Sequence, residues 1–136
     1  MSALSIITAA APKIAAAFYP LYQKRLREFP TSLHDEILRL GKANAPQGEE
    51  LALAQMGKWL TDGWTLFDAA QLGVLPAATR FQMRQPGQSR VFIEDDALCH
   101  VVQRAWRETI VPPAKELLAL GASVPMSKDV RDYLGK

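Results

Sequence analysis

Apolar residues recur at helical spacing along most of this 136-residue chain. Between residues 3 and 29 they stand three or four positions apart, at Ile7, Ala10, Ile14, Phe18 and Leu21. This spacing is typical of an amphipathic helix. Pro12 and Pro20 interrupt it, and each proline removes a backbone donor and crowds the preceding turn. The segment therefore predicts two or three short helices.

Three further helices are predicted before residue 74. Ser32 is placed to cap the first, which should end at Gly41. The second should begin at Glu49 and close at the pair Asp62-Gly63. A short third helix should run from Thr65 to Gly73, because Thr65 and Asp68 have the spacing of a capping box.

Residues 80–93 change to strand-like alternation. Arg80, Gln82 and Arg84 alternate with Phe81 and Met83, so the two sets should face opposite sides of a strand. The following residues 85–88 carry proline and glycine where a type II turn places them, and a second apolar run follows. The pattern predicts a β-hairpin over about 80–93.

The strongest helical stripe covers about 96–110 and is wide enough for a central position in the core. Pro112-Pro113 should stop this helix and start another that ends at Gly121, and Ser127 should cap a last short helix. We therefore predict an α+β fold, mainly α-helical, in one domain over residues 1–136. Six or seven helices should pack around the central helix, with the hairpin against one side.

Composition favours a soluble domain of the cell interior. Hydrophobic residues make up 49% and charged residues 22%, which is near the globular average and argues against disorder. Cys99 is the single cysteine, so an internal disulfide is excluded and a reducing compartment fits. No basic residue precedes the first apolar run, which argues against export, and Met1 to Pro12 is too short to span a bilayer. We expect a cytoplasmic protein without membrane insertion.

The residues that usually carry catalysis are few. His34 and His100 are the only histidines, and each diverges from its acidic or thiol neighbours on a helix. The acidic run 94–96 precedes a long helix, where capping and the helix dipole explain it. No phosphate-loop, dinucleotide, nucleophile-elbow or zinc-protease motif is present. We predict no catalytic residues, no metal and no cofactor; an enzyme whose groups converge from distant segments is the third alternative.

A nucleic-acid partner is the first alternative. The net charge is only +2, but residues 69–93 contain no acidic side chain. One face of the hairpin would then present residues that contact phosphates and base edges: Arg80, Gln82, Arg84, Gln88 and Arg90. A second basic cluster, Lys24, Arg25 and Arg27, would add salt-sensitive attraction to phosphates.

Residues 65–74, the hairpin and residues 90–98 together loosely resemble the winged helix-turn-helix of excisionase and MerR-type regulators. The resemblance covers about a quarter of the chain and would imply DNA binding. Between Gly73 and Gly87 only residues 74–86 remain, which is short for a recognition helix and a first wing strand. We therefore do not assign the chain to that family.

A protein partner is nearly balanced with nucleic acid. The amphipathic segment 19–29 carries four apolar side chains that would dock in a groove or against a second copy: Leu21, Tyr22, Leu26 and Phe29. In this interpretation the chain is a helical interaction module, such as an inhibitor, adaptor or accessory subunit. Packing within the monomer explains the same pattern. The sequence thus predicts a non-catalytic intracellular binding or regulatory protein and leaves its partner open.

Overall fold

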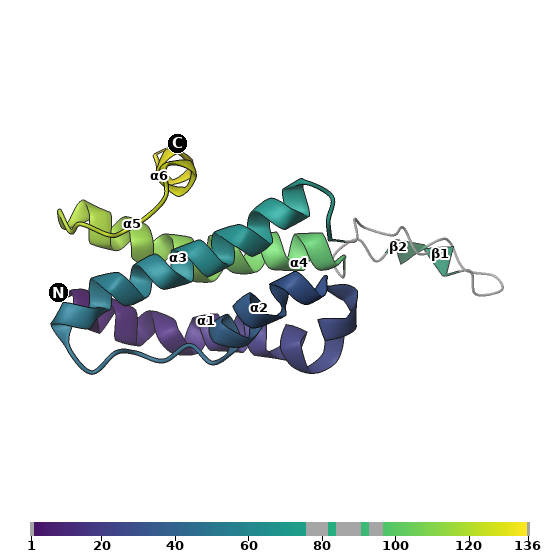
Figure 1. Cartoon of the computed structure of the whole chain (residues 1–136), viewed down its shortest axis with the longest axis horizontal. Helices are drawn as coiled ribbons and strands as arrows, with labels where there is room; N and C mark the ends of the chain where they lie inside the picture. The colour runs from purple at the N-terminus through teal and green to yellow at the C-terminus, as the bar shows by residue number, and fades with distance from the viewer. Residues whose placement is uncertain (1, 76–81, 84–90, 93–96, 136) are drawn as a thin grey trace.

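The computed structural model describes residues 2–75, 82–83, 91–92 and 97–135, and these are mostly helical (Figure 1). The α-helices are α1 (Ala3–Arg25), α2 (His34–Gly41), α3 (Glu49–Gln71), α4 (Leu98–Ala105), α5 (Val111–Ala119) and α6 (Lys128–Leu134). Two single 3₁₀ turns, Leu26–Glu28 and Thr31–Leu33, join α1 to α2. A π-helical segment, Trp106–Ile110, joins α4 to α5.

The predicted α+β fold is wrong, because the described residues form a helical protein. Since α4, the π segment and α5 are one continuous rod, there are five separate helices in the described ranges rather than six or seven. Strands β1 (Gln82–Met83) and β2 (Val91–Phe92) pair antiparallel over two residues each, too few to make a layer. They lie beyond the end of the helices rather than against one side (Figure 1).

The central position belongs to α3, not to the helix predicted over 96–110. Helix α3 packs against α1, α2, α4, α5 and α6, and it crosses the middle of the molecule in Figure 1. Its buried side chains, among them Met56, Leu60 and Leu66, are fully enclosed. The indole of Trp106 is also fully buried, so α3 and the rod from α4 to α5 share one apolar core.

Helix α1 is one helix of 23 residues, although two prolines lie inside it. Pro12 and Pro20 are exposed, as are Thr8 and Ala16, the residues whose carbonyls they leave without a helical donor. Those carbonyls lie on the solvent side, where water can satisfy them. The opposite face buries Ile7, Ile14 and other apolar residues, so packing holds the helix together and the predicted breaks do not occur.

The predicted end of a helix at Asp62-Gly63 is also wrong. Helix α3 continues to Gln71, and Thr65 lies inside it, where its hydroxyl donates to the Thr61 carbonyl at 2.9 Å instead of capping a new helix. Gly63 is buried, and a Cβ atom there would come within 2.6 Å of the Trp106 ring. Glycine is required here because it lets α3 pack closely against the Trp106 ring, and it does not end the helix.

Pro112-Pro113 does not interrupt the rod formed by α4, the π segment and α5. The Val111 amide donates to the carbonyl of Trp106, five residues earlier, which is the hydrogen bond of a π-bulge. The Thr109 hydroxyl donates to the Ala105 carbonyl at 2.6 Å. A π-bulge shifts the hydrogen-bond pattern by one residue, and the prolines follow it as the second and third residues of α5.

Several predicted helix ends are confirmed: α2 ends at Gly41 and α3 begins at Glu49. Ser127 and Gly121 also have their predicted roles, but Ser32 does not. The Ser127 hydroxyl accepts from the Val130 amide and caps α6. Gly121 follows the end of α5 with φ +80°, a conformation that favours glycine. Ser32 caps nothing, because a 3₁₀ turn precedes α2 and Leu33 stands at its N-cap position.

Candidate functional site

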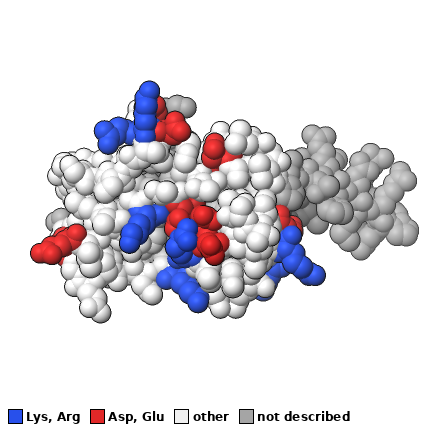
Figure 2. Space-filling view, in the orientation of Figure 1, with Lys and Arg blue, Asp and Glu red and all other residues white. Residues whose placement is uncertain are grey.

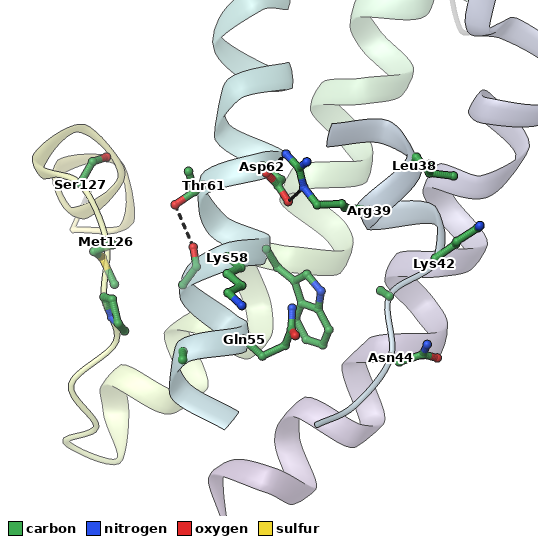
Figure 3. A pocket seen from close by; sticks show the side chains of 15 residues that line it. Leu38, Arg39, Lys42, Asn44, Gln55, Lys58, Thr61, Asp62, Met126 and Ser127 are labelled. Atoms are coloured by element: carbon green, nitrogen blue, oxygen red, sulfur yellow. Dashed lines mark hydrogen bonds and ion pairs between the residues drawn. The ribbon is translucent and has the colours of Figure 1, made fainter. Parts of the chain in front are cut away.

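An open groove of about 1010 Å³ runs over the outer face of α3 (Figure 3). Helix α3 forms its floor, while α2 with the residues after it, and the segment just before α6, form its two walls. The floor carries Ala54, Gln55, Lys58 and Thr61; the walls carry Leu38, Lys42, Asn44, Pro125 and Met126. Most of the surface inside the groove is contributed by apolar atoms. Three segments distant in sequence therefore build one concave surface.

Gly57 sets the distance between the floor and one wall. A Cβ atom at this position would lie 2.6 Å from the carbonyl oxygen of Pro125, so only glycine lets the segment before α6 approach α3 this closely. The neighbouring Ser127 caps α6 directly after this contact. The same loop thus forms a groove wall and starts the last helix.

A bidentate ion pair joins the other wall to the floor. The guanidinium of Arg39 on α2 donates to both carboxylate oxygens of Asp62 on α3, at 3.0 Å and 2.9 Å. Hydrogen bonding to Asp62 raises the pKa of Arg39 above its ordinary value, and the nearby carboxylate of Glu36 adds to the effect. Arg39 and Asp62 therefore neutralise each other and fix α2 on α3.

Two lysines give the groove its remaining charge. Lys58 projects from the middle of the floor, and Lys42 lies on the α2 side (Figure 3). Within the described part of the chain, neither ammonium group forms an ion pair. Since Asp62 is the single acidic residue of the lining and is paired with Arg39, the groove has an excess of positive charge.

The residues predicted to bind nucleic acid are only partly described. Arg80, Arg84, Gln88 and Arg90 lie outside the described residues, and for Gln82 only the backbone is described, in β1. Of the second cluster, Lys24 and Arg27 are exposed, while Arg25 pairs with Glu28 at 2.7 Å. On the face shown in Figure 2, acidic and basic side chains are interspersed and form no basic patch. Nucleic-acid binding stays a prediction from the sequence.

The four residues predicted to dock a partner lie at the end of α1 and just after it. Leu21 and Phe29 are buried in the core, with 4% and 5% of their surface exposed. Tyr22 and Leu26 are partly buried and pack against the same core. A partner could reach only Tyr22 and Leu26 without opening the fold, so this segment is a poorer docking surface than the groove.

The residues considered for catalysis do not come together. His34 Nε2 lies 3.1 Å from the Phe29 carbonyl oxygen and so contacts the backbone that precedes α2. Cys99 is buried, whereas His100 beside it is exposed. Among the described residues no three His, Cys, Asp or Glu side chains converge as metal ligands, and the run 94–96 lies outside those residues.

Helix α1 and the turn after it, Ala3–Glu28, are long and apolar enough to cross a membrane by length and composition. Of its most apolar window, 39% is buried inside the structure, and core helices of soluble proteins meet the same criterion. The predicted lack of membrane insertion therefore rests on the sequence argument alone. The apolar stretch extends beyond Met1 to Pro12, because Lys13 is the one charged residue before Lys24.

The first helix that the winged helix-turn-helix resemblance implies is not a separate helix in the structure. Residues 65–71, which should have started a separate helix, form the last turns of α3. No protein-family model, no curated protein and no solved structure matches this chain. The groove was not predicted from the sequence. The available signal was that Leu51, Ala54 and Lys58 lie on α3 outside its buried apolar stripe.

Proposed function

We propose that this protein is a non-catalytic helical interaction module of the cytoplasm. Its groove over α3 binds an amphipathic helix of a partner protein, with acidic side chains flanking the apolar face of that helix. The observation that carries the proposal is a large, mostly apolar groove with two lysines that form no ion pair within the described residues. Nothing in the groove resembles a set of reacting groups, so binding is the activity that it supports.

The shape of the groove suits a helix. Helix-in-groove recognition places apolar anchors at positions i, i+3, i+4 and i+7 of the bound helix into an apolar trough. The floor of this groove is itself a helix, and ridges of side chains on one helix pack between ridges on another. Leu51 stands one helical turn before Ala54 on α3, and 58% of its surface is exposed. An apolar side chain with that exposure is more stable when a partner covers it.

The charge of the groove selects the partner. Because Arg39 and Asp62 are paired with each other, Lys42 and Lys58 are the cations available to a bound helix. Their ammonium groups attract carboxylates and repel other cations, which favours a helix with Glu or Asp beside its apolar stripe. The long apolar stem of Lys58 can still cover an apolar anchor while its charge stays in solvent.

The test is a titration with a labelled peptide. The probe is a fluorescein-labelled amphipathic peptide of about 15 residues, long enough to form a helix, with a leucine stripe flanked by glutamates. Anisotropy should report saturable binding that weakens as salt is raised. The same peptide with lysine in place of every glutamate should bind more weakly.

Variants connect that binding to the groove. Lys58→Glu should weaken binding of the glutamate peptide about tenfold, which corresponds to about 1.4 kcal/mol, and should strengthen binding of the lysine peptide. The matched control is Lys115→Glu, an exposed lysine of α5 outside the groove, which should leave both affinities unchanged. Equal binding of the two peptides, or no effect of Lys58→Glu, would contradict the proposal.

A further inference from the structure

A second, smaller pocket of about 380 Å³ lies between the C-terminal half of α3 and α6. Each helix supplies it with both aromatic and acidic side chains, at helical spacings of three and four residues. Helix α3 contributes Trp64, Phe67 and Asp68, and α6 contributes Asp129, Asp132 and Tyr133. It shares no residue with the groove over α3.

The aromatic side of the pocket is a packed cluster. The ring centroid of Tyr133 lies 5.8 Å from that of Trp64 and 5.3 Å from that of Phe67, with the rings steeply inclined to each other. Trp106, which is fully buried, lies about 6 Å behind all three rings and fixes their positions. Trp64 and Tyr133 remain partly exposed, so part of their ring surface is open to a ligand.

The acidic side of the pocket has no internal partner. Within the described residues, Asp68, Asp129 and Asp132 form no ion pair and no side-chain hydrogen bond, and no lysine or arginine lines the pocket. Among the described residues, no three His, Cys, Asp or Glu side chains are placed to hold a metal ion, these carboxylates included. Carboxylates beside aromatic rings in one pocket suit an organic cation.

We propose that this pocket binds a methylated ammonium group. Such a cation is stabilised by the faces of Trp and Tyr rings and by carboxylates around it, and its methyl groups make apolar contacts that a hydrated metal ion cannot make. A pocket of 380 Å³ lies within the size range of small-ligand sites, about 300–1,000 Å³. This inference goes beyond the interaction module and does not depend on it.

The first test compares two ligands of nearly the same shape. Choline carries a trimethylammonium group, and 3,3-dimethylbutan-1-ol replaces it with a neutral tert-butyl group. A titration followed by NMR at the Trp64 indole N–H should show choline binding at least about fivefold more tightly, as expected for a cation on an aromatic face. Equal affinities, or no choline-dependent shift at Trp64, would overturn the proposal. This comparison uses the unaltered protein, so it does not depend on any variant folding.

Variants then test the carboxylates. Asp68→Asn and Asp132→Asn should each weaken choline binding several-fold, because both carboxylates line the pocket. The far-UV circular dichroism should stay unchanged, because neither residue is buried. Glu116→Gln, on the exposed surface of α5, is the matched control and should bind choline normally. If the asparagine variants bound choline as tightly as the unaltered protein, the carboxylates would have no role in binding and the proposed site would be wrong. A peptide with one trimethyl-lysine, titrated in parallel with choline, distinguishes a protein-borne cation from a free one.

Discussion

Gly63 allows α3 to pack closely against the rod from α4 to α5. A Cβ atom there would lie 2.6 Å from Trp106 Cε3 and 2.7 Å from Ile110 Cδ1, both in the fully buried core. Neither side chain can move without displacing its neighbours. Gly63→Ala should therefore destabilise the fold by about 1–3 kcal/mol, as overpacking usually does, even though alanine favours helix. Urea denaturation followed by circular dichroism measures the difference.

The control for that substitution is Gly135→Ala. Its new methyl group would meet the Arg131 carbonyl oxygen at 3.4 Å, an ordinary contact, and its backbone has negative φ. The expected change in unfolding free energy is within about 0.5 kcal/mol. If Gly63→Ala were as mild as this control, the close packing of α3 on the Trp106 ring would be refuted.

The ion pair between Arg25 and Glu28 makes a small part of the stability depend on pH. Hydrogen bonding from Arg25 is the largest cause that lowers the pKa of Glu28 below its ordinary value. Because the folded pKa is the lower one, the pair stabilises the fold above the unfolded pKa and loses that effect as the pH falls through the folded pKa.

Glu28→Gln should therefore reduce stability near pH 7 and have no effect in strong acid. The reduction should be below about 1 kcal/mol, because 42% of the Glu28 side chain is exposed and solvent screens the pair. Urea denaturation at a series of pH values measures it. Glu116→Gln, which has no ion pair within the described residues, should show no such dependence. A Glu28→Gln effect that persisted in strong acid would show that its cause is not the ion pair.

Glycine also shows which residue roles could be predicted from the sequence. Gly121 follows an apolar stripe and adopts positive φ, so its predicted role as a helix end is confirmed. Gly63 also follows an apolar helical stripe, with Asp62 directly before it, yet it lies inside α3 against Trp106. An apolar stripe followed by glycine therefore precedes a helix end in one case and a continuing helix in the other. What differs is the helix packed against Gly63, about forty residues further along the chain.

At the level of elements, α1 departs most clearly from helix propensity, because it contains two prolines. Pro12 lies inside a continuous helix with its ring exposed, and the Thr8 carbonyl has no helical donor. Pro12→Ala restores that donor. It should stabilise the protein by about 1–3 kcal/mol, reduced by about 0.4–1 kcal/mol because proline also restricts the unfolded chain. Thermal denaturation gives the comparison.

Pro46→Ala provides the reference for that gain. Pro46 lies in the loop between α2 and α3, where alanine restores no helical hydrogen bond, so no stabilisation is expected. If Pro12→Ala were less stable than the unaltered protein, the predicted gain would be contradicted. The Pro12 ring would then make stabilising contacts in spite of its exposure.

Element types were predictable where one helix has a clear apolar face and a capping residue. Helix α6 after Ser127 is an example. Element lengths were not predictable, because α1 and the rod from α4 to α5 run through prolines that usually end a helix. Burial of apolar faces holds these helices together, and a π-bulge adjusts the second. The pattern at 80–93 predicted a hairpin packed against the helices, whereas the described residues there show two paired residues in each strand.

At the scale of the whole molecule, the groove depends on contacts between distant segments. Its floor comes from α3, one wall from α2 and the other from the loop at Pro125, so no single stretch of sequence contains its signature. Gly57 and the Arg39–Asp62 pair hold these parts together. The individual lysines were visible in the sequence, but their common position on an apolar concave surface required the fold.

The most direct test of the central claim is to map where the acidic amphipathic peptide binds. Backbone amide shifts recorded by NMR during its titration should change most at Lys42, Gln55, Lys58 and Met126, which line the groove. The exposed residues Lys13 and Lys115, which do not line the groove, should show no change. Shifts centred on Tyr22 and Leu26, or spread evenly over exposed lysines, would contradict the assignment of the groove as the binding site.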